Sequence, residues 1–202
     1  MKGYRSDDKY EDWSCQRVWE QLQEGDLQAL RSLFLRHHNH LFDYGMQITS
    51  DRFLVEDCIH NLFYRIWESR ESLGEVISVR SYLWISFRRE LFRSANSNEP
   101  EFLTNTIQSY TPEIGFETEE MMTVEERRGE WNSSLQTAMN NLSNRQRQAI
   151  YLKYFNGMGY DEIQQIMSIN YQTARNYICS GIKALKIHFQ HMDREKIPEQ
   201  FS

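Results

Sequence analysis

Helical periodicity is the feature of this sequence that most restricts its fold. Apolar residues recur at intervals of three and four along most of the chain, and no stretch keeps the interval of two that a half-buried strand shows. The 202 residues contain only three prolines, Pro100, Pro112 and Pro198, so few positions interrupt a helix. The sequence therefore predicts an all-α protein.

A change of composition divides the chain in two. Between Asn96 and Glu130 the sequence has nine glutamates, two arginines and two of the three prolines, which interrupt any helix there. We therefore predict two small helical domains, residues 1–96 and 131–202, joined by an acidic linker over residues 97–130.

Few motifs point to chemistry. The three cysteines, Cys15, Cys58 and Cys179, are far apart and form no CxxC, which argues against a disulfide framework and a zinc site. The sequence has no glycine-rich phosphate loop, GxSxG or HExxH, so we predict neither enzymatic activity nor a cofactor. The first 14 residues are polar and no apolar run is long enough to span a bilayer, which predicts a cytoplasmic protein.

Three histidines, His37, His38 and His40, lie close together in the sequence. They have no cysteine or carboxylate partner at ligand spacing nearby, and we interpret them as ordinary surface histidines. A metal-dependent hydrolase built around His37 and His40 is the least favoured alternative.

The N-terminal domain is expected to begin with a short helix, about 15–23, and a second helix capped by Asp26. A longer helix over about 52–69 has one apolar half. Its opposite face carries a mixture of acidic, amide and aromatic side chains, namely Glu56, Asp57, His60, Asn61 and Tyr64. This face is either a solvated surface or a docking surface for a protein.

The next helix, about 79–95, is expected to turn Val79, Leu83, Phe87 and Leu91 inward. Its other side is basic and aromatic, with Arg80, Trp84, Arg88, Arg89 and Arg93 against a single acid, Glu90. Such a strip can bind phosphates and stack unpaired bases on the indole. The alternative is a solvated face with a partly buried tryptophan.

The C-terminal domain holds the most specific motif. Residues 143–190 have six basic and two acidic side chains, a net charge of +4, although the whole chain carries −6. One helix is expected from Ser143 to Phe155, a glycine turn follows, and a short helix over 160–167 precedes Ser168-Ile169-Asn170 and a final helix. This pattern predicts a helix-turn-helix.

The start of the second helix of such a motif enters the major groove. Gln172, Arg175 and Asn176 would then reach base edges, because arginine pairs with guanine and asparagine or glutamine with adenine. Lys183 and Lys186 would contact phosphates. The alternative is a helical hairpin that binds a protein.

These motifs together resemble the extracytoplasmic-function sigma factors, a group of the sigma-70 family that keeps only regions two and four. Val55-Glu56-Asp57, the run from Phe63 to Glu68 and the run from Val79 to Leu83 are similar to region two. The runs Leu142 to Arg147, Tyr160 to Ile163 and Tyr171 to Asn176 are similar to region four. Ser168 stands where the family frequently has glycine; a left-handed serine there would cost roughly 1 to 2 kcal/mol.

The resemblance implies a set of partners and sites. The face of Glu56, Asp57, His60, Asn61 and Tyr64 would dock on core RNA polymerase. The loop at 71–78 and the strip of Arg80, Trp84, Arg88, Arg89 and Arg93 would engage the minus-ten element of promoter DNA. Tyr171, Gln172, Thr173, Arg175, Asn176, Lys183 and Lys186 would contact the minus-thirty-five element. Members of this family are often held by an anti-sigma factor, commonly a membrane-anchored one.

A different class of protein also fits part of the pattern. A conventional transcriptional regulator would combine an N-terminal sensing or dimerisation domain with the same helix-turn-helix. It would bind duplex DNA without polymerase, and it predicts a ligand pocket or a dimer surface.

Overall fold

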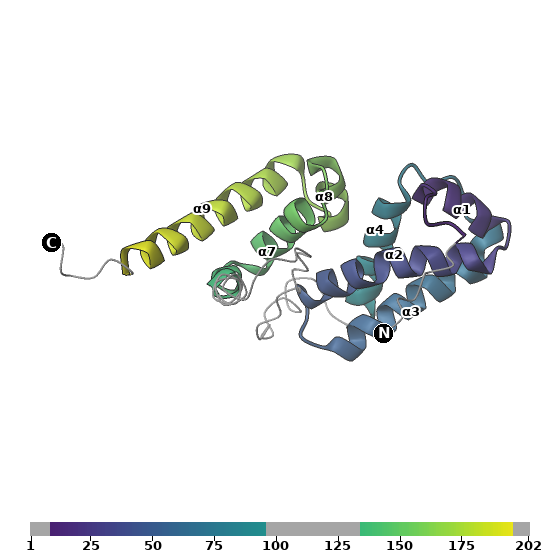
Figure 1. Ribbon diagram of the computed structural model, residues 1–202, viewed down its shortest axis with the longest axis horizontal. Coiled ribbons are helices and arrows are strands. Elements are labelled where there is room, and N and C mark those ends of the chain that lie inside the picture. The colour runs from purple at the N-terminus through teal and green to yellow at the C-terminus, as the bar shows by residue number, and fades with distance from the viewer. Residues whose placement is uncertain (1–8, 96–133, 196–202) are drawn as a thin grey trace, which may run out of the picture. The chain divides into compact units, whose positions relative to one another are not determined.

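The computed structural model describes residues 9–95 and 134–195, with side chains in the last helix up to residue 190 (Figure 1). All regular structure in these ranges is helical, which confirms the all-α fold class. The helices are α1 (Cys15–Gln23), α2 (Leu27–Met46), α3 (Arg52–Ser69), η1 (Arg70–Ser72), α4 (Val79–Ser94), a helical segment over 134–140, α7 (Asn144–Ile150), η2 (Tyr151–Phe155), α8 (Tyr160–Met167) and α9 (Tyr171–Glu195).

The chain divides into two compact units, which we describe separately. The helices α1 to α4 belong to the first unit, and the helices from residue 134 onward belong to the second. The predicted linker, 97–130, lies outside the described residues, so its boundaries stay a prediction. Within the described residues, no helix combines the length and the apolar character that crossing a membrane requires.

Short polar side chains determine where the helices of the first unit begin. Each accepts a hydrogen bond from a backbone N–H of the first turn, a group that the helix itself leaves without a partner. The pairs are Ser14 Oγ with the Arg17 N–H at 3.3 Å, Asp51 Oδ1 with the Leu54 N–H at 3.0 Å, and Ser78 Oγ with the Ser81 N–H at 3.2 Å.

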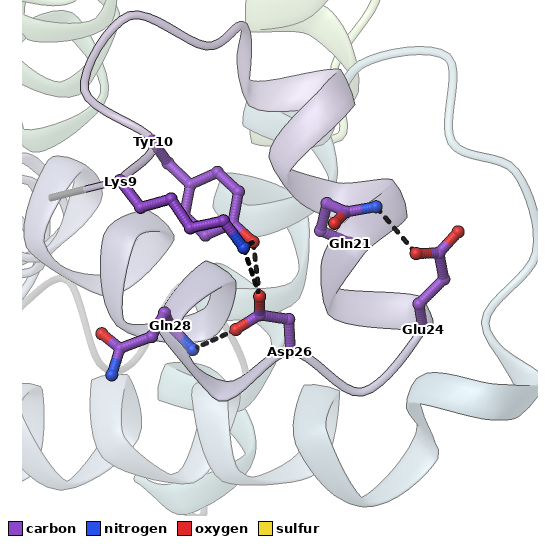
Figure 2. Close-up of polar contacts among 6 residues, drawn as sticks. All are labelled: Lys9, Tyr10, Gln21, Glu24, Asp26 and Gln28. Atoms are coloured by element: carbon purple, nitrogen blue, oxygen red, sulfur yellow. Dashed lines mark hydrogen bonds and ion pairs between the residues drawn. The ribbon is translucent and has the colours of Figure 1, made fainter.

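Asp26 caps α2 as predicted and also anchors the segment that precedes α1 (Figure 2). Its Oδ1 accepts the Gln28 N–H at 2.8 Å, and its Oδ2 accepts the buried Tyr10 hydroxyl at 2.5 Å and Lys9 Nζ at 3.1 Å. The hydrogen bond from Tyr10 is the main reason why the pKa of Asp26 falls to about 2. One carboxylate thereby joins the chain before α1 to the start of α2.

The core of the first unit forms where α4 packs on α3 and α1. The predicted inward residues of α4, Val79, Leu83, Phe87 and Leu91, are all buried. The helix α3 contributes a wide apolar face that consists of Val55, Cys58, Ile59, Leu62, Phe63 and Ile66. This region therefore has the amphipathic helices that the periodicity predicts.

Close approach in this core depends on Gly45, near the end of α2. A Cβ atom at this position would lie 2.6 Å from Val55 Cγ1 and 3.0 Å from Phe87 Cζ. Two neighbouring side chains thus occupy the space that any larger residue needs.

His37 is buried, so the interpretation of all three histidines as surface residues is wrong for this one. Its side chain is 6% exposed, its Nε2 lies 3.5 Å from Cys15 Sγ, and its ring meets the Trp84 ring edge-on at 5.6 Å. His40 is exposed. In the part of the chain that the structure describes, no three metal-binding side chains gather into a possible metal site.

The burial of His37 predicts a pH dependence of stability. Burial is the largest cause that lowers the pKa of His37 to about 4, followed by the nearby charges of His40, Arg36 and Arg80. The histidine is neutral when folded and has a pKa near 6.5 when unfolded. The neutral, buried His37 therefore contributes fully to the free energy of unfolding above about pH 6.5. This contribution is lost as the pH falls toward 4, and the total loss is about 3 kcal/mol.

Urea unfolding followed by the fluorescence of the first unit's tryptophans measures this effect. The free energy of unfolding of His37→Gln should fall less between pH 7 and pH 4.5 than that of the natural protein, by about 2 kcal/mol. His60→Gln, at an exposed position of α3 outside the set of groups that act on His37, is the matched control and should keep the natural slope. Equal slopes for all three proteins would contradict the assignment.

Candidate nucleic-acid and polymerase interfaces

A tight turn joins the two helices of the predicted helix-turn-helix. Ser168, directly after α8, is left-handed with φ 53° and ψ 46°, and in the described ranges it is the only non-glycine residue with positive φ. The Ile169 N–H donates to the Gln164 carbonyl at 3.0 Å, and the Ser168 N–H donates to the Gln165 carbonyl at 3.3 Å. This is the Schellman arrangement that ends many helices, here with serine in the position that usually holds glycine.

The next helix, α9, begins at Tyr171, three residues after Ser168. The Asn170 side chain accepts the Thr173 N–H at 2.7 Å and so caps α9. Between α8 and α9, the apolar side chains of Ile163, Ile166, Met167, Ala174 and Ile178 are buried, while those of Ile169 and Tyr177 are partly buried. The two helices of the motif therefore pack on each other through an apolar interface.

The helix before this motif differs from its prediction in one respect. It begins at Ser143, where Ser143 and Gln146 cap each other's backbone N–H groups, as the expected start requires. Beyond Ile150, however, it continues as a π-helix, η2, instead of an α-helix. The helix α9 crosses α7 closely at Gly181, where a Cβ atom would lie 2.5 Å from Ile150 Cδ1. A lone glycine inside a helical pattern was the available signal for this contact.

The first half of α9 presents a continuous polar face. Residues three and four apart share a helix face, and Gln172, Arg175, Asn176, Lys183 and Lys186 are all exposed on it. Gln172 Nε2 donates to Asn176 Oδ1 at 3.0 Å, so two of the predicted base-reading groups are joined. Tyr171 is 47% exposed and packs against Tyr160, and Thr173 is partly buried beside the cap.

The predicted basic and aromatic strip on α4 is only partly exposed, and two of its members are corrected. Trp84 is 1% exposed and Arg88 is 4% exposed. The indole packs against His37, and Arg88 Nη1 donates to the Tyr44 hydroxyl at 2.9 Å. Because neighbouring helices surround α4, its buried face extends one row beyond the apolar stripe. The prediction that Trp84 offers an open stacking surface is wrong for this conformation.

The other arginines of the strip remain accessible. Arg89 and Arg93 are exposed and Arg80 is partly buried. A hollow of about 270 Å³ lies between α3 and α4. It is lined by polar and apolar side chains, namely Tyr82, Ser86, Arg89, Glu90 and Arg93 from α4 and Leu62, Arg65, Ile66 and Ser69 from α3. The sequence analysis did not assign Arg65 to this surface, because Arg65 belongs to α3 and helical spacing does not relate residues of different helices.

The loop before α4 is attached to α1 through two amide side chains. Gln23 Nε2 donates to the Leu73 carbonyl at 2.6 Å, and Gln16 Nε2 donates to the Val76 carbonyl at 3.1 Å. The next side chain, Ile77, is fully exposed. Neither glutamine carries a sequence signal for this contact.

The outer face of α3 has the mixed character that the sequence predicts. Asp57, His60, Asn61 and Tyr64 are exposed, and Glu56 is partly exposed with an ion pair to Arg52 at 3.3 Å. His60 stacks on Phe34 of α2 at 5.9 Å. The five residues form one surface, in which acidic groups and an exposed tyrosine lie side by side.

Comparison with known proteins assigns the family. The family described as Sigma-70, region 4 matches residues 133–185, which include α7, α8 and the first part of α9. The ECF RNA polymerase sigma factor SigK of Mycobacterium sp. (strain KMS) is 22% identical over 173 residues, which cover 82% of this chain and 86% of the relative. Together these matches support an extracytoplasmic-function sigma factor of the sigma-70 type. The RNA polymerase sigma factor SigK of Mycobacterium sp. (strain MCS) matches with the same identity and coverage.

The region 4 match and the sigma-factor relatives support a sigma factor that recognises promoters. A match over 82% of the chain cannot be confined to the C-terminal domain, so the conventional regulator with an unrelated sensing domain is not favoured.

Two solved structures have a similar fold. The structure of CnrH in complex with the cytosolic domain of CnrY has a TM-score of 0.58 at 14% identity, covering 88% of this sigma factor and 99% of that chain. The sigma factor RpoE from Bartonella quintana, in complex with the anti-sigma factor NepR, has a TM-score of 0.57 at 15% identity, covering 79% and 96%.

The left-handed serine predicts a stabilising substitution. Ser168→Gly removes the steric cost of the Cβ atom and should raise the opening free energy of α8 and α9 by about 1 kcal/mol. Hydrogen exchange of the backbone amides in these helices measures the change locally. The control Gln165→Gly, at an exposed right-handed position of α8, should lower the same free energy by about 1 kcal/mol. A Ser168→Gly protein no more stable than the natural one would show that the serine is unstrained.

Proposed function

We propose that this sigma factor uses three separate surfaces to bind core RNA polymerase and to recognise the two promoter elements. The observation that supports this most directly is the exposed polar row at the start of α9, whose chemistry suits base edges. In this assignment Gln172, Arg175 and Asn176 read the minus-thirty-five element in the major groove. Lys183 and Lys186, further along the same face, contact phosphates.

The hydrogen bond between Gln172 and Asn176 supports a reading role. It restrains two amide side chains before DNA arrives, which reduces the entropy lost when they pair with adenine. Tyr171 and Thr173 lie at the first turn of α9 and complete this surface next to the DNA backbone.

The outer face of α3 is assigned to the polymerase. Glu56 and Asp57 would repel a phosphate backbone, whereas an acidic face with an exposed tyrosine suits a protein partner. His60, Asn61 and Tyr64 extend the same face. The assignment to core polymerase, rather than to another protein, rests on the resemblance to region two.

The arginines of α4 are assigned to the minus-ten element in a revised form. Arg80, Arg89 and Arg93 contact the backbone of the opened strand, and the loop at 73–78 lies at the end of the same surface. Trp84 and Arg88 support α4 from within and make no stacking contact with bases in this conformation.

We further assign an anti-sigma partner and a cytoplasmic location to this protein. CnrH and RpoE are each described in complex with another protein, the cytosolic domain of CnrY and the anti-sigma factor NepR. A sigma factor works where core polymerase and DNA are, which is the basis for the location. Sigma factors are initiation factors, and the proposal gives the chain no chemical step of its own.

Run-off transcription with purified core polymerase and a genomic promoter library tests the assignment. Asp57→Arg should abolish stimulation of the core enzyme, because it reverses a charge at the polymerase surface. Arg175→Ala should weaken promoter use about tenfold or more, the cost of one lost bidentate base contact. Glu20→Arg and Arg31→Ala, at exposed positions outside all three surfaces, are the matched controls. Normal transcription by both test variants would contradict the proposal.

A cysteine within the α9 face provides a second test. Cys179 is exposed on the row that carries Arg175, Asn176 and Lys183, whereas Cys58 is buried and Cys15 is partly buried. Iodoacetamide should alkylate Cys179 at least about tenfold more slowly in the initiation complex, because duplex DNA covers this row.

Mass spectrometry of the labelled peptides measures each thiol separately. The protection should disappear on a promoter whose minus-thirty-five element is replaced, with the same polymerase present. Equal alkylation on both promoters would show that this face of α9 does not lie on that element.

A further inference from the structure

A buried acid lies among the exposed arginines of the first unit. The Glu90 side chain is 7% exposed, although it belongs to the same helix as Arg89 and Arg93. Its Oε2 accepts Arg65 Nη1 at 2.8 Å, and both of its oxygens accept Arg93 Nη2, at 2.7 and 2.9 Å. One carboxylate therefore joins an arginine of α3 to an arginine of α4.

The two arginines differ from Glu90 in exposure. Their side chains are 52% and 59% exposed, and both line the hollow between α3 and α4 together with Arg89. A guanidinium group carries five N–H donors, so each arginine can hold the carboxylate and still donate to an anion from solvent. Three arginines against one glutamate leave this hollow with a positive charge.

Stability gives a weak account of this arrangement. Removing a carboxylate from water costs free energy that its ion pairs only partly return, and a buried ion pair is often no more stable than an apolar replacement. Glu90 instead orders the side chains of Arg65 and Arg93, which would otherwise sample many rotamers in water. Side chains that are ordered in advance lose less entropy when a ligand binds.

We propose that Glu90 is a positioning residue that holds Arg65 and Arg93 at the rim of the α3–α4 hollow, where both guanidinium groups bind phosphates of the unwound promoter strand. This inference rests on the proposed minus-ten role of α4. The proposal adds Arg65 to the DNA surface. Glu90 would not contact the phosphates itself, but would orient the two arginines that bind them.

Binding of holoenzyme to a forked DNA probe tests this proposal. The probe has a single-stranded minus-ten element and comes from a promoter that the natural protein transcribes, so a failure of the proposed function would already appear as a lack of transcription. The variants are Glu90→Leu, the double variant Arg65→Ala/Arg93→Ala, and the combination of all three. Glu20→Leu and Arg31→Ala, at exposed positions elsewhere, are the controls.

Four results are expected. The double arginine variant weakens binding, and its plot of log affinity against log salt loses about 1.4 in slope, the value for two single-strand phosphate contacts. Glu90→Leu weakens binding about tenfold, the scale of immobilising two long side chains. Glu90→Leu has no further effect when both arginines are already absent. Both controls bind like the natural protein.

Other results would overturn the proposal. Unchanged binding by Glu90→Leu would mean that the arginines need no positioning, and tighter binding would mean that Glu90 masks them. Equal weakening by Glu90→Leu with and without the arginines would mean that Glu90 acts through the fold. If Glu90→Leu fails to fold by circular dichroism, Glu90→Gln keeps the shape and one acceptor, and the same comparison with the double variant applies.

Discussion

The direction in which α9 leaves α8 decides which of its side chains face solvent in the helix-turn-helix. A turn of three residues sets this direction, and its first residue, Ser168, is left-handed. Two backbone hydrogen bonds end α8 at this point and the Asn170 side chain begins α9, so the local bonding leaves little freedom between the helices. The polar row with Arg175 and Asn176 faces outward because Ala174 and Ile178 face inward. The exposure of this polar row in the second unit thus depends on the backbone conformation of the turn.

In the first unit, the exposed charges lie on α4, a helix that is mostly buried. Four apolar residues of α4 are buried, and so are Trp84 and Arg88 in the neighbouring row. Arg88 has a specific partner in this interior, the Tyr44 hydroxyl. What remains at the surface is a narrow edge of arginines, and Glu90 joins one of them to α3. The buried side chains and the exposed arginines of α4 therefore lie on adjacent rows of the same helix.

Much of this could be predicted from the sequence, because local rules dominate it. Helix starts follow from capping residues such as Asp26 and Ser143, and the exposed faces of α3 and α9 follow from helical spacing. The errors concern positions where several helices meet. His37 and Trp84 have polar or amphipathic side chains that belong on a surface when one helix is considered alone, and they are buried because three-dimensional packing widens the core.

Other features had no local signal at all. The contact of Gln23 with the backbone at Leu73 joins residues 50 positions apart, and the pairing of Arg65 with Glu90 joins residues 25 positions apart. Periodicity describes one helix at a time, so it cannot indicate which side chains of different helices meet. The change to a π-helix after Ile150 likewise had no signal in the helical spacing of the sequence.

The two glycines at close helix contacts, Gly45 and Gly181, have a consequence for how proteins of this kind vary. Every residue other than glycine would place a Cβ atom 2.6 Å from Val55 Cγ1 at the first position and 2.5 Å from Ile150 Cδ1 at the second. A change at Gly45 therefore needs a change in the short side chain of Val55, and a change at Gly181 needs a rotation of the flexible Ile150 side chain, whereas an exposed residue of α9 such as Gln172 can be exchanged by itself. The exposed row can therefore vary by single substitutions, while the first unit keeps an interior position that we expect to change only together with its neighbour.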